Sequence, residues 1–195
     1  MFVAFLNSLV KNEISPKGPK NAILLASVFF TGAAVLIIEV IAMRILSPYY
    51  GNTIYTASSV IGIVLAALSL GYYFGGKLAD RYPSFSLFYL VIFVSGLLIL
   101  QMQIANVLVL PFLSLVLSLS LGPLISSLML FFVPAFTLGI LSPFAVRIYN
   151  IHDISVGRRS GEVFFWSTLG SIFGSLLAGF FLIPHFGISG VMIVL

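Results

Sequence analysis

The sequence has very few charged residues and no cysteine. Charged side chains make up 7% of its 195 residues, whereas soluble domains average about 25%. So little polar surface excludes a soluble domain and indicates an integral membrane protein in a lipid bilayer. The absence of cysteine also excludes structural disulfides and thiolate metal sites.

Other polar chemistry is equally sparse. The two histidines, His152 and His185, lie far apart in the sequence, so a histidine-based metal site is not predicted. The net charge of +4 suits contact with anionic lipid headgroups and requires no nucleic acid. We therefore expect no metal, no cofactor held by this chain, and no nucleic-acid partner.

Long hydrophobic runs take the place of charge. A helix needs about 20 mainly apolar residues to cross a bilayer. The stretches that satisfy this are 22–47, 54–76, 86–106, 124–146 and 162–183. They predict an all-α, polytopic transmembrane helix bundle of five or six spans over residues 21–195, after an N-terminal cytoplasmic or interfacial arm over 1–20. Residues 188–195 resemble the opening of a further helix that the chain does not complete.

Residues 107–121 are apolar but short, and they contain Pro111. Lys and Arg concentrate in short cytoplasmic loops. If the N-terminus is inside and 107–121 is a re-entrant or interfacial helix, only Arg44 of nine basic residues lies outside. If 107–121 crosses, Arg147, Arg158 and Arg159 lie outside as well. We favour the first arrangement, in a prokaryotic plasma membrane with the N-terminus cytoplasmic. The rival is a regular six-helix half-bundle.

The run LIIEVIAMRILSPYYG, residues 36–51, places a glutamate and an arginine inside an apolar segment. Glu39 lies roughly 27 Å along the helix from Asn21, in the outer third of a core about 30 Å thick. Arg44 is about 140° around the helix from Glu39, which disfavours an ion pair within the helix. An unpaired carboxylate at this depth costs about 1–3 kcal/mol. Glu39 is therefore either a proton- or cation-binding residue or a polar tie between helices.

The stretch SPYYGNTIYTAS, residues 47–58, follows directly. Pro48 is expected to stop the helix and Gly51 to turn the chain. Tyr49, Tyr50 and Tyr55 then fall at interface depth, as in an aromatic belt. The same tyrosines, with the glutamate, could instead hold a polyamine or another cation through cation–π contacts and charge. The candidate ligand- or ion-binding residues are Glu39, Arg44, Tyr49 and Tyr55.

Two polar connections carry most of the remaining charge. In residues 75–84, Asp80 could cap the next helix or pair across the bundle, and Arg81 follows it. In residues 142–166, the arginines could bind lipid phosphate or a soluble partner. The candidates for a cytoplasmic gate or partner contact are Asp80, Arg81, Arg147, Arg158 and Arg159.

Glycines recur at helical spacing in the second and fifth spans. They are Gly71-x-x-x-Gly75, Gly170-x-x-x-Gly174 and, further on, Gly179. Small residues at this spacing let helix backbones approach closely in lipid. We predict packing within the chain, with a homodimer interface as the less favoured alternative.

Most of the chain resembles the membrane-embedded N-terminal region of fused spermidine synthase-like proteins. The resemblance covers nearly all of residues 25–190, through GAAVLIIEVIAMRILSPYYGNTIYTASSVIGIVLAALSLGYYFGGKLADRYPS, LGILSPFAVRI and SGEVFFWSTLGSIFGSLLAGFFLIPHFG. The matched positions include Gly32, Glu39, Arg44, Pro48, Gly51, Gly71, Gly75, Gly76, Asp80, Arg81, Gly139, Pro143, Arg147, Gly161, Thr168, Gly170, Gly174, Gly179, Pro184 and Gly187. In that family a cytoplasmic aminopropyltransferase-type domain follows the membrane domain and binds an S-adenosylmethionine-type nucleoside. This sequence has no G-x-G-x-x-G and only five acidic residues, so the nucleoside is expected only in an associated soluble domain.

A second, partial resemblance is carried by Gly76-x-x-x-Asp80-Arg81. This looks like the signature between the second and third helices of major facilitator transporters, where the acidic and basic residues help to latch the inward gate. The sequence then departs from that signature, continuing Tyr82-Pro83-Ser84.

Three functions follow as hypotheses. The first is a membrane domain that anchors a spermidine synthase-like soluble domain or subunit and supplies or exports a polyamine or related substrate. The second is a small, dimeric, proton-coupled transporter of small cations with major-facilitator-like features. The third is a structural membrane anchor only. Under all three hypotheses, the chain is not expected to catalyse aminopropyl transfer by itself.

Overall fold

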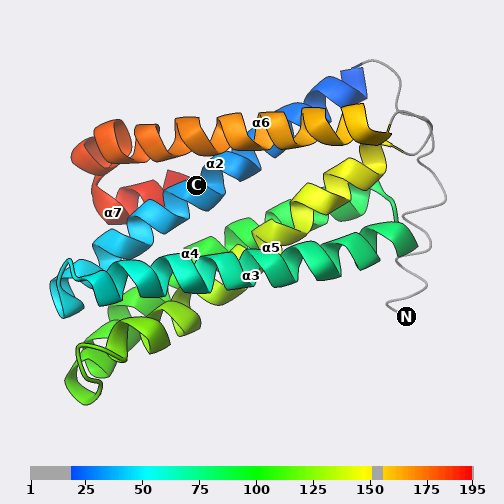
Figure 1. Ribbon diagram of the computed structural model, residues 1–195. Coiled ribbons are helices and arrows are strands. Elements are labelled where there is room, and N and C mark those ends of the chain that lie inside the picture. The colour runs from blue at the N-terminus through cyan, green and yellow to red at the C-terminus, as the bar shows by residue number, and fades with distance from the viewer. Residues whose placement is uncertain (1–18, 151–155, 195) are drawn as a thin grey trace.

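The computed structural model describes residues 19–150 and 156–194 (Figure 1). These residues form long helices, and no strand occurs in either range. In chain order the elements are α2 (Pro19–Tyr50), α3 (Ile54–Arg81), α4 (Phe85–Val116), α5 (Gly122–Tyr149), α6 (Val156–Leu177), the π-helix η1 (Ala178–Leu182) and α7 (Ile183–Val194). The predicted all-α bundle is confirmed. The arm expected over residues 1–20 lies, up to residue 18, outside the described residues.

Within residues 19–150 and 156–194, five helices are long and apolar enough to cross a membrane. They cover Asn21–Tyr50, Ile54–Arg81, Phe85–Val116, Gly122–Tyr149 and Val156–Ile188. Each of these helices contains one of the predicted spans. The chain is therefore an integral membrane protein. The helices extend beyond the predicted limits because hydropathy marks only the apolar stretch that crosses lipid, whereas the helix continues into the polar interface.

Residues 107–116 are the last part of α4 and do not form a separate re-entrant or interfacial helix. Pro111 removes one backbone hydrogen bond, but a membrane helix tolerates this where side chains satisfy the freed groups. The carbonyl that Pro111 leaves without a donor is that of Val107, four residues earlier, and α4 nevertheless continues to Val116. Similarly, α2 continues through Pro48 to Tyr50, and the chain turns only at Gly51, whose φ is 76°.

The last span ends in a reversal. A π-helical turn, η1, interrupts it, and Gly187 then adopts a φ of 66°, where a side chain would be strained. Residues 188–194 resume a helix that runs back from this reversal, and α7 contacts α4 and α2 (Figure 1). Val191 and Met192 in this returning segment are fully buried, so it completes the core.

Two pairs of helices make backbone contact. In the first pair, α2 packs along α6; in the second, α3 packs along α5. The two helices of each pair run parallel, because the residue numbers of the contacting positions increase in the same direction along both helices. A Cβ at Gly170 would overlap the carbonyl oxygen of Phe29, and one at Gly174 would stand 2.6 Å from that of Ala33.

The second pair uses the same device. A Cβ at Gly71 would overlap the carbonyl oxygen of Phe136, and one at Gly75 would stand 2.6 Å from that of Ile140. Gly179, by contrast, has nothing within 4 Å of where a Cβ would stand. Four of the five glycines singled out in the sequence therefore lie at helix contacts within this chain, and α5 also contacts α2, α4 and α6.

The two ends of the bundle differ in character (Figure 1). One end, called the basic end here, gathers the last residues of α3 and α5 and the first residues of α6. It carries Lys77, Arg81, Arg147, Arg158 and Arg159. The opposite end, called the tyrosine end here, joins α2 to α3 and carries Tyr49, Tyr50 and Tyr55.

We predict that Gly170→Ala destabilises the bundle by about 1–3 kcal/mol, because its methyl group would overlap backbone that cannot move aside. Gly62→Ala is the matched control, since nothing lies within 4 Å of that position. It should leave stability unchanged or raise it by up to about 1 kcal/mol, because alanine favours helix. The readout is Trp166, the one tryptophan in the chain, whose ring lies 6.4 Å from that of Phe29 across the α2–α6 contact. Equal unfolding midpoints for the two variants would contradict this account.

Candidate functional site

Glu39 is half-buried on α2, between mid-height and the tyrosine end. The midpoint of α2 falls between residues 34 and 35, so Glu39 lies about 7 Å beyond it along the axis. Within residues 19–150 and 156–194 its carboxylate has no hydrogen-bond or ion-pair partner. Glu39 and Arg44 form no ion pair in these ranges, and Arg44 is exposed.

A cavity of about 110 Å³ lies where the two helix pairs meet. All four of those helices line it: Thr31, Gly32, Val35 and Leu36 from α2, Leu68 and Tyr72 from α3, Leu138 and Ser142 from α5, and Ser167 and Ser171 from α6. Five of these ten residues carry a hydroxyl group. We call this space the hydroxyl cavity.

The hydroxyls divide into two groups. Thr31 donates to the carbonyl of Val28 at 3.2 Å, and Ser171 donates to the carbonyl of Gly32 at 2.9 Å, joining α6 to α2. The hydroxyls of Tyr72, Ser142 and Ser167 have no hydrogen-bond partner in the described part of the chain. These three groups are therefore available to a guest or to water.

Glu39 continues the wall of this cavity along α2. It follows Val35 by four residues and Leu36 by three, and residues at these spacings are neighbours on a helix surface. The carboxylate therefore lies on the same side of α2 as the hydroxyl cavity, one turn nearer the tyrosine end. Together they offer one negative charge and several hydroxyl oxygens, a set suited to a small cation that can donate hydrogen bonds.

The predicted tyrosines do not gather around Glu39. Tyr49 is half-buried and lies ten residues further along α2, about 15 Å in helix rise. Tyr55 is 56% exposed at the start of α3. Only an extended ligand with separated charges could reach from the carboxylate to these rings.

Tyr50 does not belong to an aromatic belt at the interface. It is 2% exposed, and its hydroxyl lies 2.9 Å from that of Ser126 on α5. Gly122 makes room for this, because a Cβ there would overlap the tyrosine ring. This hydrogen bond joins the two helix pairs at the tyrosine end.

The charged residues predicted for a gate or partner contact come together at the basic end. Asp80 and Arg147 form an ion pair at 3.1 Å between α3 and α5, with side chains 74% and 46% exposed. An exposed pair of this kind contributes at most about 1 kcal/mol. It therefore joins two helices that the glycines already hold together.

A second polar contact at the basic end joins α5 to α6. Tyr149 donates to Glu162 at 2.6 Å, and Arg158 donates to the same carboxylate at 3.2 Å. Arg159 donates to the backbone carbonyl of Tyr149. Arg81 is exposed, with its guanidinium 5.6 Å from the centre of the Tyr82 ring. His152 lies outside the described residues.

Sequence reasoning missed the cavity hydroxyls. Ser167 and Ser171 are four residues apart in an apolar helix, which could have marked a polar stripe. Thr31, Tyr72 and Ser142, by contrast, are each the one hydroxyl that their helix contributes to the cavity lining, so nothing in the sequence groups them. Among the described residues no three His, Cys, Asp or Glu side chains group together in a way that could hold a metal ion.

Comparison with known proteins yields no match: no family model, no curated protein and no solved structure matches this chain.

We predict that Ser126→Ala lowers stability by about 0.5–1.5 kcal/mol, because it removes a buried hydrogen bond between helices. Ser127→Ala is the adjacent control. Ser127 is equally buried, but its hydroxyl has no hydrogen-bond partner, so its removal should be neutral or stabilising. Unfolding of both variants in detergent, followed through Trp166, checks this. If Ser127→Ala proves the more damaging change, the assignment of the Tyr50–Ser126 bond is wrong.

Proposed function

We propose that this chain is the membrane domain of a spermidine synthase-like protein and that it binds a polyamine or related small cation. The site is the Glu39 carboxylate together with the hydroxyl cavity. The domain supplies or exports this cation for a cytoplasmic aminopropyltransferase-type domain or subunit. The observation that carries the proposal is a carboxylate without a described partner, on the helix face that lines a hydroxyl-rich cavity.

The chemistry of the cavity supports a cationic ligand. An unpaired carboxylate at the depth of Glu39 costs about 1–3 kcal/mol unless a counter-charge or water meets it. An ammonium group supplies that charge and has three N–H donors for the surrounding oxygens. The purely structural reading of Glu39, as a tie between helices, needs a partner on another helix, and none lies in the described ranges.

The distribution of basic residues supports an orientation. Lys77, Arg81 and the three arginines of α5 and α6 lie at the basic end, and Arg44 lies toward the tyrosine end. Under the positive-inside rule the basic end faces the cytoplasm, which we take to be that of a prokaryotic cell. A soluble partner would meet the bundle at this end, and an S-adenosylmethionine-type nucleoside would bind to that partner and not to this chain.

The first test is binding. Glu39→Gln should weaken spermidine binding to the chain in nanodiscs by about tenfold or more, because it removes the counter-charge, and tenfold corresponds to about 1.4 kcal/mol. Glu162→Gln makes the same chemical change at the basic end and should leave affinity within about twofold. Equilibrium binding of radiolabelled spermidine measures both variants. Unchanged affinity in Glu39→Gln would sink the proposal.

The second test is orientation. Because the chain lacks cysteine, single-cysteine variants report on position without background. Asn52→Cys and Gly157→Cys, both exposed and at opposite ends, should react with an impermeant maleimide from opposite sides of spheroplasts. We expect Asn52→Cys to react from outside and Gly157→Cys only after permeabilisation. The six-span alternative predicts that both react from the same side.

One observation favours a transporter as the second candidate. The hydroxyl cavity lies between two helix pairs that are hydrogen-bonded to each other at both ends, through Tyr50–Ser126 and Tyr149–Glu162. A site between two bodies with a closable contact at each end suits alternating access. A small dimeric, proton-coupled transporter requires flux of the cation into liposomes driven by a pH gradient, and its absence would contradict this candidate.

A further inference from the structure

Gln101 is a polar residue that neither the resemblance nor the proposed function uses. It lies at the midpoint of α4, whose bounds are Phe85 and Val116, and therefore near the centre of the span. Its side chain is exposed on the bundle surface, and it has no hydrogen-bond partner in the part of the chain described here. A carboxamide offers two donors and an acceptor, and leaving them unmet in hydrocarbon is costly.

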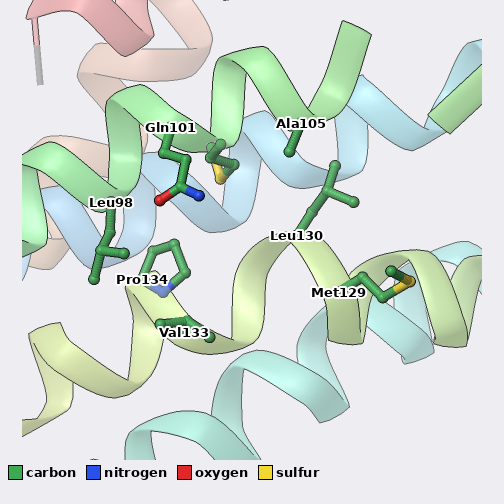
Figure 2. Close-up of a pocket in the computed structure, with 8 residues that line it drawn as sticks. Leu98, Gln101, Ala105, Met129, Leu130, Val133 and Pro134 are labelled. Carbon is green, nitrogen blue, oxygen red and sulfur yellow. The ribbon is translucent and has the colours of Figure 1, made fainter. Parts of the chain in front are cut away.

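The side chain of Gln101 points into a cavity of about 170 Å³ between α4 and α5. Figure 2 shows its carboxamide directed from α4 toward Pro134 on α5. The other lining residues are Leu98, Met102, Ala105, Met129, Leu130 and Val133. Met129 and Val133 are 58% and 49% exposed, so the cavity opens on the surface that faces lipid.

Pro134 leaves a backbone carbonyl on α5, the opposite wall, without its helical hydrogen bond. Proline has no backbone N–H, so the carbonyl four residues earlier, that of Leu130, loses its usual helical donor. Leu130 and Pro134 both line the cavity. The site therefore combines a carboxamide on α4 with an acceptor on α5 that lacks its helical partner.

We propose that this cavity binds the hydroxyl group of a lipid-soluble alcohol that enters from the bilayer. A hydroxyl is the smallest group that can form a hydrogen bond with each wall of the cavity. Its O–H donates to the Leu130 carbonyl, and its oxygen accepts from the Gln101 Nε2. The lining has no charged residue, which excludes a polyamine and separates this site from the one at Glu39. The volume corresponds to about five or six water molecules, enough for the hydroxyl and the first carbons of a chain that continues into lipid.

The experiment is photolabelling of the whole chain in nanodiscs. The probes are a long-chain alcohol with a diazirine near the hydroxyl and the same molecule with a methyl group in place of the hydroxyl. The alcohol should label peptides containing Met102 or Met129 at least about threefold more than the hydrocarbon, the preference expected of two hydrogen bonds in competition with lipid.

Two variants remove the two hydrogen-bonding groups independently. Gln101→Leu removes the carboxamide, and Pro134→Ala restores the helical donor to the Leu130 carbonyl. Each should abolish most of the preference for the alcohol. Gln103→Leu and Pro111→Ala, the same changes at positions that do not line the cavity, should keep it, and Trp166 fluorescence verifies that all four variants are folded.

Two results would overturn the proposal. Equal labelling by the alcohol and the hydrocarbon would mean that the cavity holds only acyl chains. Efficient disulfide formation between two copies of Gln101→Cys in the bilayer would mean that a second copy of the chain covers the site instead.

Discussion

The rest of the bundle depends on backbone-to-backbone contact in the two helix pairs. Lipid provides no hydrophobic drive for helices to associate, so their association relies on close packing and on hydrogen bonds between helices. Gly170 and Gly174 bring α6 against α2, and Gly71 and Gly75 bring α3 against α5. These contacts fix which faces of the four helices remain to enclose anything else.

The hydroxyl cavity follows from that arrangement. Two close pairs can meet along their lengths only where their side chains interdigitate. At the meeting of α2, α3, α5 and α6, half of the lining residues carry a hydroxyl group and Gly32 has no side chain. Ser171 serves both purposes, since its hydroxyl bonds to the backbone of Gly32 and also lines the cavity. Gly32 has the same double role, because a Cβ there would overlap the carbonyl oxygen of Ser167. Packing and polarity are therefore set by the same few residues.

Features that depend on neighbouring residues could be predicted from the sequence, whereas contacts between distant residues could not. The spans could be predicted because apolar length is a local property, and Glu39 stands out because it interrupts such a run. The partners of each helix could not be predicted: the Ser171–Gly32 bond joins residues 139 positions apart. Unless it is known which helices pack together, Tyr50 resembles an interface residue and the cavity hydroxyls resemble ordinary span residues. Gly179 does not lie at a helix contact, for a geometric reason. The four-residue spacing of Gly170 and Gly174 continues to Ala178, which is fully buried. Gly179 is one residue further and therefore about 100° around the helix from the contact face.

Helix α5 connects the two polar regions of the bundle. Its first half, with Leu130 and Pro134, forms one wall of the lipid-facing cavity, and its second half, with Leu138 and Ser142, lines the hydroxyl cavity. Prolines occur in both halves, at 134 and 143, and each leaves a carbonyl without its helical donor and weakens the helix locally. A helix of this kind would be a poor element on the periphery, where lipid surrounds the freed groups. It is tolerated here because α5 contacts α2, α3, α4 and α6, so neighbouring helices surround it. The freed carbonyls belong to Leu130, which lines the lipid-facing cavity, and to Gly139, which packs against α3.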